Sequence, residues 1–280
     1  MVWSSTITIC FFSFMFDYLA NNITISSGTA LRFVGPYGQT LNLNGKTIQC
    51  ITAGNDVTIG IQATGSLNFI VNGGGGSYIK GCRIGIDAPR DWTRIQEVLF
   101  QGIKYMAINL SGYMGKAIMN QIDTVGGVTD EAYSVGINVS GDGGIVRGNY
   151  IHNLYRQVGA APDLVGEGVP IILNASSHGS LVELNYLEND ASVGDTIGIF
   201  AGSGGGHTIR QNSIRNFCRG IESGAASQLW DNVVTLGSPV DDSLGISASM
   251  GAVFGNLIAG YPEGSAVRTV PESGNAVYPR

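Results

Sequence analysis

Charged side chains recur at two fixed distances from a series of asparagines in the second half of the chain. The residues two before successive asparagines include Arg147, Glu183 and Arg210. The residues three after successive asparagines include His152, Glu188 and Arg215. Histidine and carboxylate groups can transfer protons, and arginine binds anionic ligands through charge-assisted hydrogen bonds. We therefore predict His152 and Glu188 as catalytic candidates, and the three arginines with Glu183 as ligand-binding candidates. The alternative is a file of surface ion pairs, which contribute little to stability.

A second group of acidic residues lies three positions before a recurrent Gly-Ile pair or its equivalent. Its members are Glu167, Asp195 and Asp242. If Glu167 and Asp195 occupy neighbouring parallel strands, they stand about 5 Å apart. Two carboxylates in such an arrangement can cleave a glycosidic bond or bind Ca²⁺. We predict all three as catalytic candidates, and Glu167 with Asp195 as calcium ligands if a cofactor is used. Otherwise they are ordinary turn carboxylates.

Aromatic side chains accompany the charged ones. Tyr150 and Tyr186 directly follow two of the asparagines, and the longest step between asparagines includes the segment Tyr155–Gly168. Long loops often carry function, and a sugar can stack on the flat face of an aromatic ring. We predict Tyr150 and Tyr186 as binding residues and the Tyr155–Gly168 loop as one wall of a cleft.

The asparagines themselves mark a repeat. They lie in AIMNQI, VRGNYI, VELNYL, IRQNSI, LWDNVV and VFGNLI, at Asn120, Asn149, Asn185, Asn212, Asn232 and Asn256. The residues three before and two after each asparagine are apolar, whereas the residues beside them are mixed. Such alternation indicates strands with an interior and a solvent face. The six asparagines span 136 residues in five steps of about 27 residues, a period typical of solenoids.

Two solenoid architectures place an asparagine in this way. Leucine-rich repeats need a further apolar residue five positions before the asparagine. Here that position holds Gly115, Gly144, Ser180, His207, Ser227 and Gly251. Short β-branched runs and 42 glycines instead favour a parallel β-helix. We expect each asparagine at a tight bend, in the left-handed backbone region that asparagine tolerates, with successive amides forming a hydrogen-bonded ladder.

The chain resembles the pectin-lyase-like superfamily. The segments TLNLNGKTIQC (Thr40–Cys50), VTIGIQATGS, VRGNYIHN and IRQNSIRN are similar to coils of its secreted β-helix repeat proteins, and the resemblance extends from about residue 28 to residue 260. It implies an all-β fold, a single-stranded right-handed parallel β-helix (solenoid). Members include lyases, hydrolases, epimerases, phage tail proteins and noncatalytic modules, so the fold does not assign an activity. The NTD, GHG and RIK segments of polygalacturonases and the RxPxxR segment of pectate lyases are absent from this sequence.

These patterns divide the chain into three parts. We predict a β-helix of roughly 8–10 coils over residues 28–262 and a C-terminal tail over residues 263–280. Residues 1–27 contain the apolar block ITICFFSFMF (Ile7–Phe16). This block is the core of a signal peptide, a cap over the open end of the solenoid, or a truncated or misread start. As a cap, FFSFMFDYLANN (Phe11–Asn22) would form a short amphipathic helix.

Composition excludes some functions. A net charge of −6 and a pI of about 5.0 argue against a nucleic-acid partner, and no run of 18 apolar residues could span a membrane. The four cysteines fit no zinc motif. Cys50 and Cys82 lie about one coil apart, so a disulfide between them and two small buried thiols are both compatible with the sequence.

Two functional hypotheses follow. The first is an extracellular or cell-surface β-helix protein, monomeric or trimeric, that binds a polysaccharide and, if the charged residues are catalytic, cleaves or epimerises it. The second is a noncatalytic rod, such as an adhesin or part of a phage tail. A trimeric rod needs an exposed apolar stripe along several coils, for which Ile118, Ile172 and Phe200 are scattered candidates.

Overall fold

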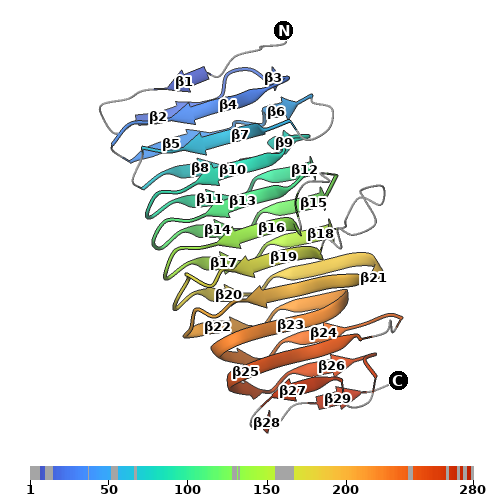
Figure 1. The fold of residues 1–280 in the computed structure, drawn as a ribbon. Helices are drawn as coiled ribbons and strands as arrows, with labels where there is room; N and C mark the ends of the chain where they lie inside the picture. The colour runs from blue at the N-terminus through green and yellow to red at the C-terminus, as the bar shows by residue number, and fades with distance from the viewer. Residues whose placement is uncertain are drawn as a thin grey trace.

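The structure is a computed structural model of the 280-residue chain. It describes residues 7–9, 15–36, 38–51, 56–65, 68–127, 131, 133–154, 167–238, 242–262, 265–269, 272–273 and 276–278. These residues form an all-β right-handed parallel β-helix, whose coils stack from the N-terminal to the C-terminal end (Figure 1). None of them belongs to a helix that is long and apolar enough to cross a membrane.

Each coil contributes a strand, or part of one, to each of three faces, and all strand pairs between coils are parallel. The first face contains β1 (Ile7–Ile9), β4 (Gly28–Phe33), β7 (Thr58–Ala63), β10 (Ile84–Ala88), β13 (Met106–Leu110), β16 (Tyr133–Val139), β19 (Glu167–Leu173), β27 (Val267–Thr269), and parts of the long strands β21 (Tyr186–Ala201), β23 (Ser213–Trp230) and β25 (Leu244–Phe254). The second face contains β2 (Met15–Tyr18), β5 (Gln39–Asn42), β8 (Ile70–Asn72), β11 (Arg94–Gln96), β14 (Lys116–Ile118), β17 (Ile145–Arg147), β20 (Leu181–Glu183), β22 (His207–Arg210), β28 (Glu272–Ser273), and the ends of β23 and β25. The third face contains β3 (Ile23–Ile25), β6 (Thr47–Cys50), β9 (Tyr78–Lys80), β12 (Leu99–Ile103), β15 (Gln121–Val125), β18 (Tyr150–Leu154), β24 (Val233–Thr235), β26 (Leu257–Ala259), β29 (Ala276–Tyr278), and the starts of β21 and β23.

The described residues therefore form eleven coils. Nine of them, from the coil that begins at β4 to the coil that ends at β26, lie within residues 28–262, in agreement with the predicted 8–10. One further coil precedes them, because β1, β2 and β3 pair with β4, β5 and β6. Another follows them in residues 263–280, where β27 and β29 pair with β25 and β26.

The capping helix considered for Phe11–Asn22 is wrong where the structure describes that segment. Met15–Tyr18 is strand β2, which pairs in register with Gln39–Asn42. Pairing with β5 satisfies the main-chain groups that β2 directs towards β5 and continues the second face by one coil. Cys10 and residues 11–14 lie outside the described residues.

The core fills the inside of the tube. The central residues of the third face all point inward and are buried: Ile48, Ile79, Phe100, Ile122, Ile151, Leu187, Ile214, Val234 and Ile258. The recurrent Gly-Ile pair packs against this row. A Cβ at Gly198 would lie 2.5 Å from Ile214 Cγ2 and 2.6 Å from the main-chain oxygen of Gly220. No side chain fits at Gly198, because Ile214 and the next coil approach its Cα too closely. This close approach explains why glycine recurs in the Gly-Ile pair.

The predicted asparagine ladder is confirmed. Each ladder amide from Asn120 to Asn232 donates from Nδ2 to Oδ1 of the next asparagine, at 2.9–3.0 Å. Each also donates to a main-chain oxygen of the preceding coil, as Asn185 does to Val146 O at 3.0 Å. All six asparagines are at most 1% exposed. The ladder thus satisfies buried polar groups of every bend that it connects.

The backbone role expected of these asparagines is wrong. The left-handed residue at each bend is the one before the asparagine: Met119, Gly148, Leu184, Gln211, Asp231 and Gly255. The asparagine is selected by its buried amide instead, while the preceding position faces solvent and accepts several residue types. Asn153 and Asn216, four residues further along, do have positive φ values of 54° and 62°.

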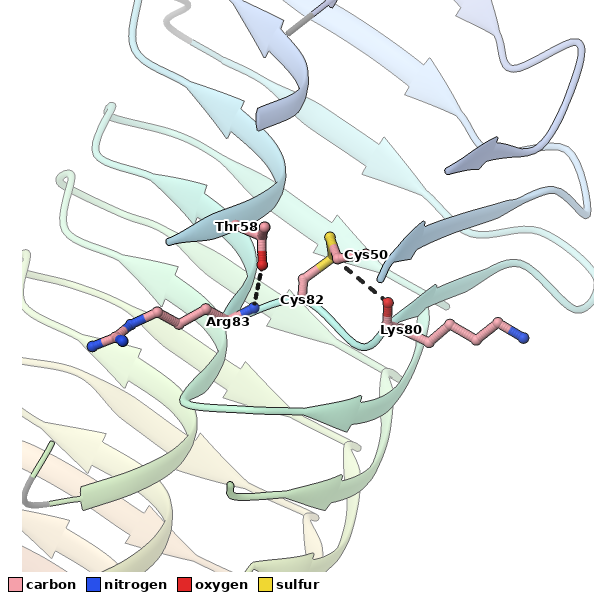
Figure 2. Close-up of a disulfide and its surroundings, with 5 residues drawn as sticks. All are labelled: Cys50, Thr58, Lys80, Cys82 and Arg83. Atoms are coloured by element: carbon pink, nitrogen blue, oxygen red, sulfur yellow. Dashed lines mark hydrogen bonds between the residues drawn. A yellow bond between two sulfur atoms is a disulfide. The ribbon is translucent and has the colours of Figure 1, made fainter. Parts of the chain in front are cut away.

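Of the alternatives for the cysteines, the structure has the disulfide. Cys50 and Cys82 are bonded, with their Cα atoms 4.7 Å apart. Figure 2 shows the bond at the corner between the third and first faces, beside the main-chain N–H of Arg83, which donates to Thr58 Oγ1 at 3.0 Å. The bond joins the second coil to the third.

Replacing Asn185 with alanine tests the ladder. The change leaves the main-chain N–H of Asn149 and the carbonyl of Val146 without their amide partners. We expect the free energy of unfolding in urea to fall by about 2–4 kcal/mol. Gln228→Ala, which removes an exposed amide, is the control and should change it by less than about 0.5 kcal/mol. Equal effects of the two changes would show that the ladder does not stabilise the coils.

Candidate functional site

The first candidate group lies on the second face. Arg147, Glu183 and Arg210 are paired in register on β17, β20 and β22, as predicted. Glu183 Oε2 accepts from Arg210 Nε at 2.8 Å and lies 2.6 Å from Nη2, and Oε1 lies 3.4 Å from Arg147 Nε. The Glu183 side chain is only 6% exposed, against 55% for Arg147. Both arginines therefore neutralise one buried carboxylate. A role for this column in ligand binding stays a prediction.

The same column continues as an aromatic stack. The Arg210 guanidinium carbon lies 5.0 Å from the ring centroid of Trp230, a cation–π contact. Trp230 in turn stacks on Phe254, with ring centroids 5.9 Å apart.

The second candidate group lies on the third face. Tyr150 and Tyr186 stack with ring centroids 5.5 Å apart and planes at 9°. The next outward column contains His152, Glu188 and Arg215 in register. Glu188 accepts a hydrogen bond from the Tyr186 hydroxyl at 3.2 Å and forms an ion pair with Arg215 at 3.2 Å. The structure thus brings these five predicted residues together, on a different face from Arg147 and Arg210.

His152 bridges two carboxylates. Its Nε2 lies 2.9 Å from Asp190 Oδ1 and its Nδ1 lies 3.3 Å from Asp123 Oδ1. Burial lowers the pKa of His152, but the hydrogen bonds to Asp190 and Asp123 outweigh burial and raise the pKa above its ordinary value. Hydrogen bonds from Asn153 and His152 lower the pKa of Asp190. Sequence reasoning missed Asp190. A usable signal was present, because Asp190 directly follows Asn189, which lies four residues after Asn185 just as Asn153 and Asn216 lie four residues after Asn149 and Asn212.

The three other predicted carboxylates are only partly described by the structure. Asp242 is exposed in the turn before β25, and Phe217, the residue three before the Gly220–Ile221 pair, is fully buried and pairs with Val193 rather than with Asp195. Glu167 begins β19 and Asp195 lies in β21, but both side chains fall outside the described part of the structure. Among the side chains that are described, no group of three His, Cys, Asp or Glu residues could hold a metal ion. Calcium binding by Glu167 and Asp195 stays a prediction.

A cleft with a volume of about 290 Å³ lies on the first face, across β13, β16, β19 and β21. Its lining consists of Tyr105, Met106, Tyr133, Val135, Asn138, Val169, Ile172, Asn174 and Phe200. Met106, Val135 and Val169 are buried, whereas Tyr133 is 46% exposed. The cleft therefore combines an apolar floor with the exposed residues Tyr133 and Asn174 and with the largely buried amide of Asn138.

A buried cation outside the lining lies beside the lining residue Tyr105. Arg83 forms an ion pair with Glu131 at 2.7 Å, and its guanidinium carbon lies 5.8 Å from the Tyr105 ring centroid. Burial and the charge of Glu131 raise the pKa of Tyr105, against the opposing effect of Arg83. The Tyr105 hydroxyl thus keeps its proton and remains a hydrogen-bond donor at neutral pH.

Sequence reasoning did not find this cleft. Ile172 and Phe200 were noted only as scattered apolar residues, although the structure pairs them on neighbouring strands. The lining mixes residue types from coil to coil, so no repeating column marks it. A signal was present in Asn109 and Asn138, which are in register on β13 and β16.

One solved structure supports the assignment of the architecture, and two others match with lower TM-scores. The tailspike protein of Escherichia coli bacteriophage HK620, solved as a mutant in complex with a pentasaccharide, matches at 11% identity with a TM-score of 0.50. That match covers 99% of this chain but only 57% of the tailspike chain. An alginate lyase from Paenibacillus sp. str. FPU-7 has 13% identity and a TM-score of 0.41, with 92% of this chain and 88% of that chain covered. PfbA, a surface adhesin of Streptococcus pneumoniae, has 11% identity and a TM-score of 0.38, with coverages of 99% and 82%. No protein-family model and no curated protein sequence matches the chain.

The His152 cluster predicts a pH-dependent contribution to stability. Because its pKa is raised on folding, protonated His152 stabilises the fold below the unfolded-state pKa of about 6.5, and this stabilisation is lost as the pH rises through the higher folded-state pKa. We expect the unfolding free energies of the wild type and His152→Gln to differ most at acid pH and to converge above that pKa.

The double variant Asp123→Asn/Asp190→Asn is the control, because burial then acts on His152 without the two carboxylates. Its His152 pKa, measured by NMR, should lie below that of the wild type. A His152→Gln effect that is constant with pH would contradict the bridge.

Proposed function

We propose that this protein binds a polysaccharide in the cleft of its first face. The observation that carries the proposal is the lining, which places Tyr105, Tyr133 and Phe200 around a cleft of about 290 Å³ together with two amide side chains. Concave sites with mostly apolar walls and a few polar groups are typical ligand sites. Aromatic faces suit the C–H surfaces of sugar rings, and Asn138 and Asn174 suit their hydroxyl groups.

An extended ligand can continue beyond the cleft along the axis of the solenoid. Towards the N-terminus, the outward residues in register with Asn138 are the polar Asn109, Asp87 and Gln62. Towards the C-terminus, Phe200 is followed by Glu222. Hydrogen-bonding groups therefore recur on this face at the strand spacing of about 4.8 Å, which suits a polymer better than a single small molecule.

The lining supports binding more strongly than cleavage. Tyr105 and Tyr133 are the titratable residues of the described lining, and neither is a carboxylate. The predicted candidates His152 and Glu188 lie on the third face. Glu167 is the predicted catalytic residue with support from the cleft, because its backbone pairs with that of Tyr133. If Glu167 is catalytic, the wild type should release cleavage products from a bound glycan and Glu167→Gln should not. If the wild type binds a glycan without releasing products, the protein is a binding module.

The disulfide supports an extracellular or cell-surface location. Disulfides persist in oxidising compartments and are rare where cytosolic reductants act. Cys50 and Cys82 are buried at 4% and 0% exposure, so their bond is a structural link between coils. Protein found only inside the cell with both thiols reduced would contradict this location.

Two tyrosines on different faces discriminate between the candidate sites. A glycan array first identifies a bound polysaccharide. We then expect Tyr133→Ala to weaken its binding by roughly tenfold, which corresponds to about 1.4 kcal/mol, because the variant loses an aromatic wall of the cleft. Tyr150→Ala is the matched control on the third face, and Tyr78→Ala removes a tyrosine of similar exposure that no predicted site uses. Weakened binding in Tyr150→Ala with normal binding in Tyr133→Ala would move the site to the third face.

A further inference from the structure

Four outward side chains of the first face form a continuous hydrogen-bonded file that ends in the cleft. Gln62, Asp87, Asn109 and Asn138 come from the successive strands β7, β10, β13 and β16, where they are paired in register. Asn138 is a lining residue of the cleft. Asp87 lies two coils away from Asn138 and is not part of the lining.

The hydrogen bonds of the file all run in one direction on the cleft side of Asp87. Asn109 donates from Nδ2 to Asp87 Oδ1 at 2.9 Å. Asn138 donates from Nδ2 to Asn109 Oδ1 at 2.8 Å and to Ser140 Oγ at 3.0 Å. On the other side, Gln62 donates from Nε2 to Asp87 Oδ2 at 3.1 Å.

Asp87 fixes this direction because a carboxylate accepts hydrogen bonds and has none to donate. Asn109 must therefore turn its NH₂ group towards Asp87 and its oxygen towards Asn138. Asn138 must then turn its NH₂ group towards Asn109. Both N–H groups of Asn138 are used by Asn109 and Ser140, and its Oδ1 is left as an acceptor at the cleft.

We infer that Asp87 is a positioning residue that determines the specificity of the cleft, by fixing Asn138 Oδ1 as a hydrogen-bond acceptor towards the ligand. An acceptor binds the hydroxyl groups of neutral sugars. It disfavours a carboxylate, which offers a second acceptor and a negative charge. This inference rests on the proposed function and deepens it, because it assigns the cleft to neutral sugar units rather than to uronates.

The charges around the cleft agree with this selection. None of the nine described lining residues is cationic. The nearby Arg83 is already paired with Glu131. A uronate in the cleft would therefore find no free positive charge among these residues, and a buried charge without a partner is costly.

The experiment compares two probes that differ only at the groups in question. A cello-oligosaccharide carries hydroxymethyl groups, and the oligoglucuronate made by oxidising them carries carboxylates on the same backbone. We expect the wild type to prefer the neutral probe. In Asp87→Asn the file can reverse, because the new side chain can donate to Asn109, and Asn138 can then present N–H groups. The ratio of the two Kd values should move towards the carboxylate by roughly five- to tenfold, the value of one hydrogen bond.

A second variant separates positioning from folding. In Gln62→Glu/Asp87→Asn the carboxylate moves one coil further from the cleft, and the overall charge equals that of the wild type. The file regains its original direction, so the preference for the neutral probe should return. The inference would be overturned if the Kd ratio were unchanged in Asp87→Asn. It would also be overturned if the ratio shifted in Asp87→Asn and the double variant did not restore it. Neither result would contradict polysaccharide binding.

A wild type that binds neither probe, nor any glycan on an array, would contradict the proposed function instead. The direction of the file can still be measured in that case, because neutron diffraction locates the amide deuterons. Deuterons of Asn138 directed into the cleft would overturn the inference independently of any sugar.

Discussion

Parallel main-chain pairing between successive coils, in a register that shifts only within the pairings β21–β23 and β23–β25 of the described strands, is the constraint on which the rest of the structure depends. It places side chains at equivalent positions of successive coils about 4.8 Å apart. Each side chain therefore contacts its equivalents in the two neighbouring coils. Inside the tube this gives a continuous apolar core, and at the bends it gives an amide ladder. Outside, the same register creates the files that carry chemistry: the Glu183 ion pairs, the Tyr150–Tyr186 stack and the amides that extend from Asp87.

The buried polar groups limit how far that register can vary. An asparagine of the ladder is tolerated in the interior because both ends of its amide are hydrogen-bonded, and a slip of one residue would bury an unpaired amide and expose the apolar core. Gly198 sets a similar limit, since a side chain there would collide with Ile214 and with the next coil. Among the described residues, the irregularities of register lie within the long strands β21 and β23, between Glu188 and Ile197 and between Ser223 and Ala226.

The fold and the charged columns could be predicted because they depend on repetition. The alternation around Asn149 and Asn185 identified both faces of their strands, and the register of Arg147 with Glu183 followed directly. The cleft could not be predicted in this way, because Tyr105, Asn138 and Phe200 differ in type, and of the three only Asn138 has an identical residue in register, Asn109. The residues of β2 illustrate a different limit: an apolar segment beside the first coil suits a helical cap or a strand, and pairing with β5 decides for the strand.

Ligand binding is proposed for the first face, where a cleft meets a file of amides that begins at Asp87. A crystal structure of the protein with a bound neutral oligosaccharide tests this most directly. It should show a sugar ring against Tyr133 or Phe200 and a sugar hydroxyl within hydrogen-bonding distance of Asn138 Oδ1. A sugar bound against Tyr150 and Tyr186 with the cleft unoccupied would contradict the account.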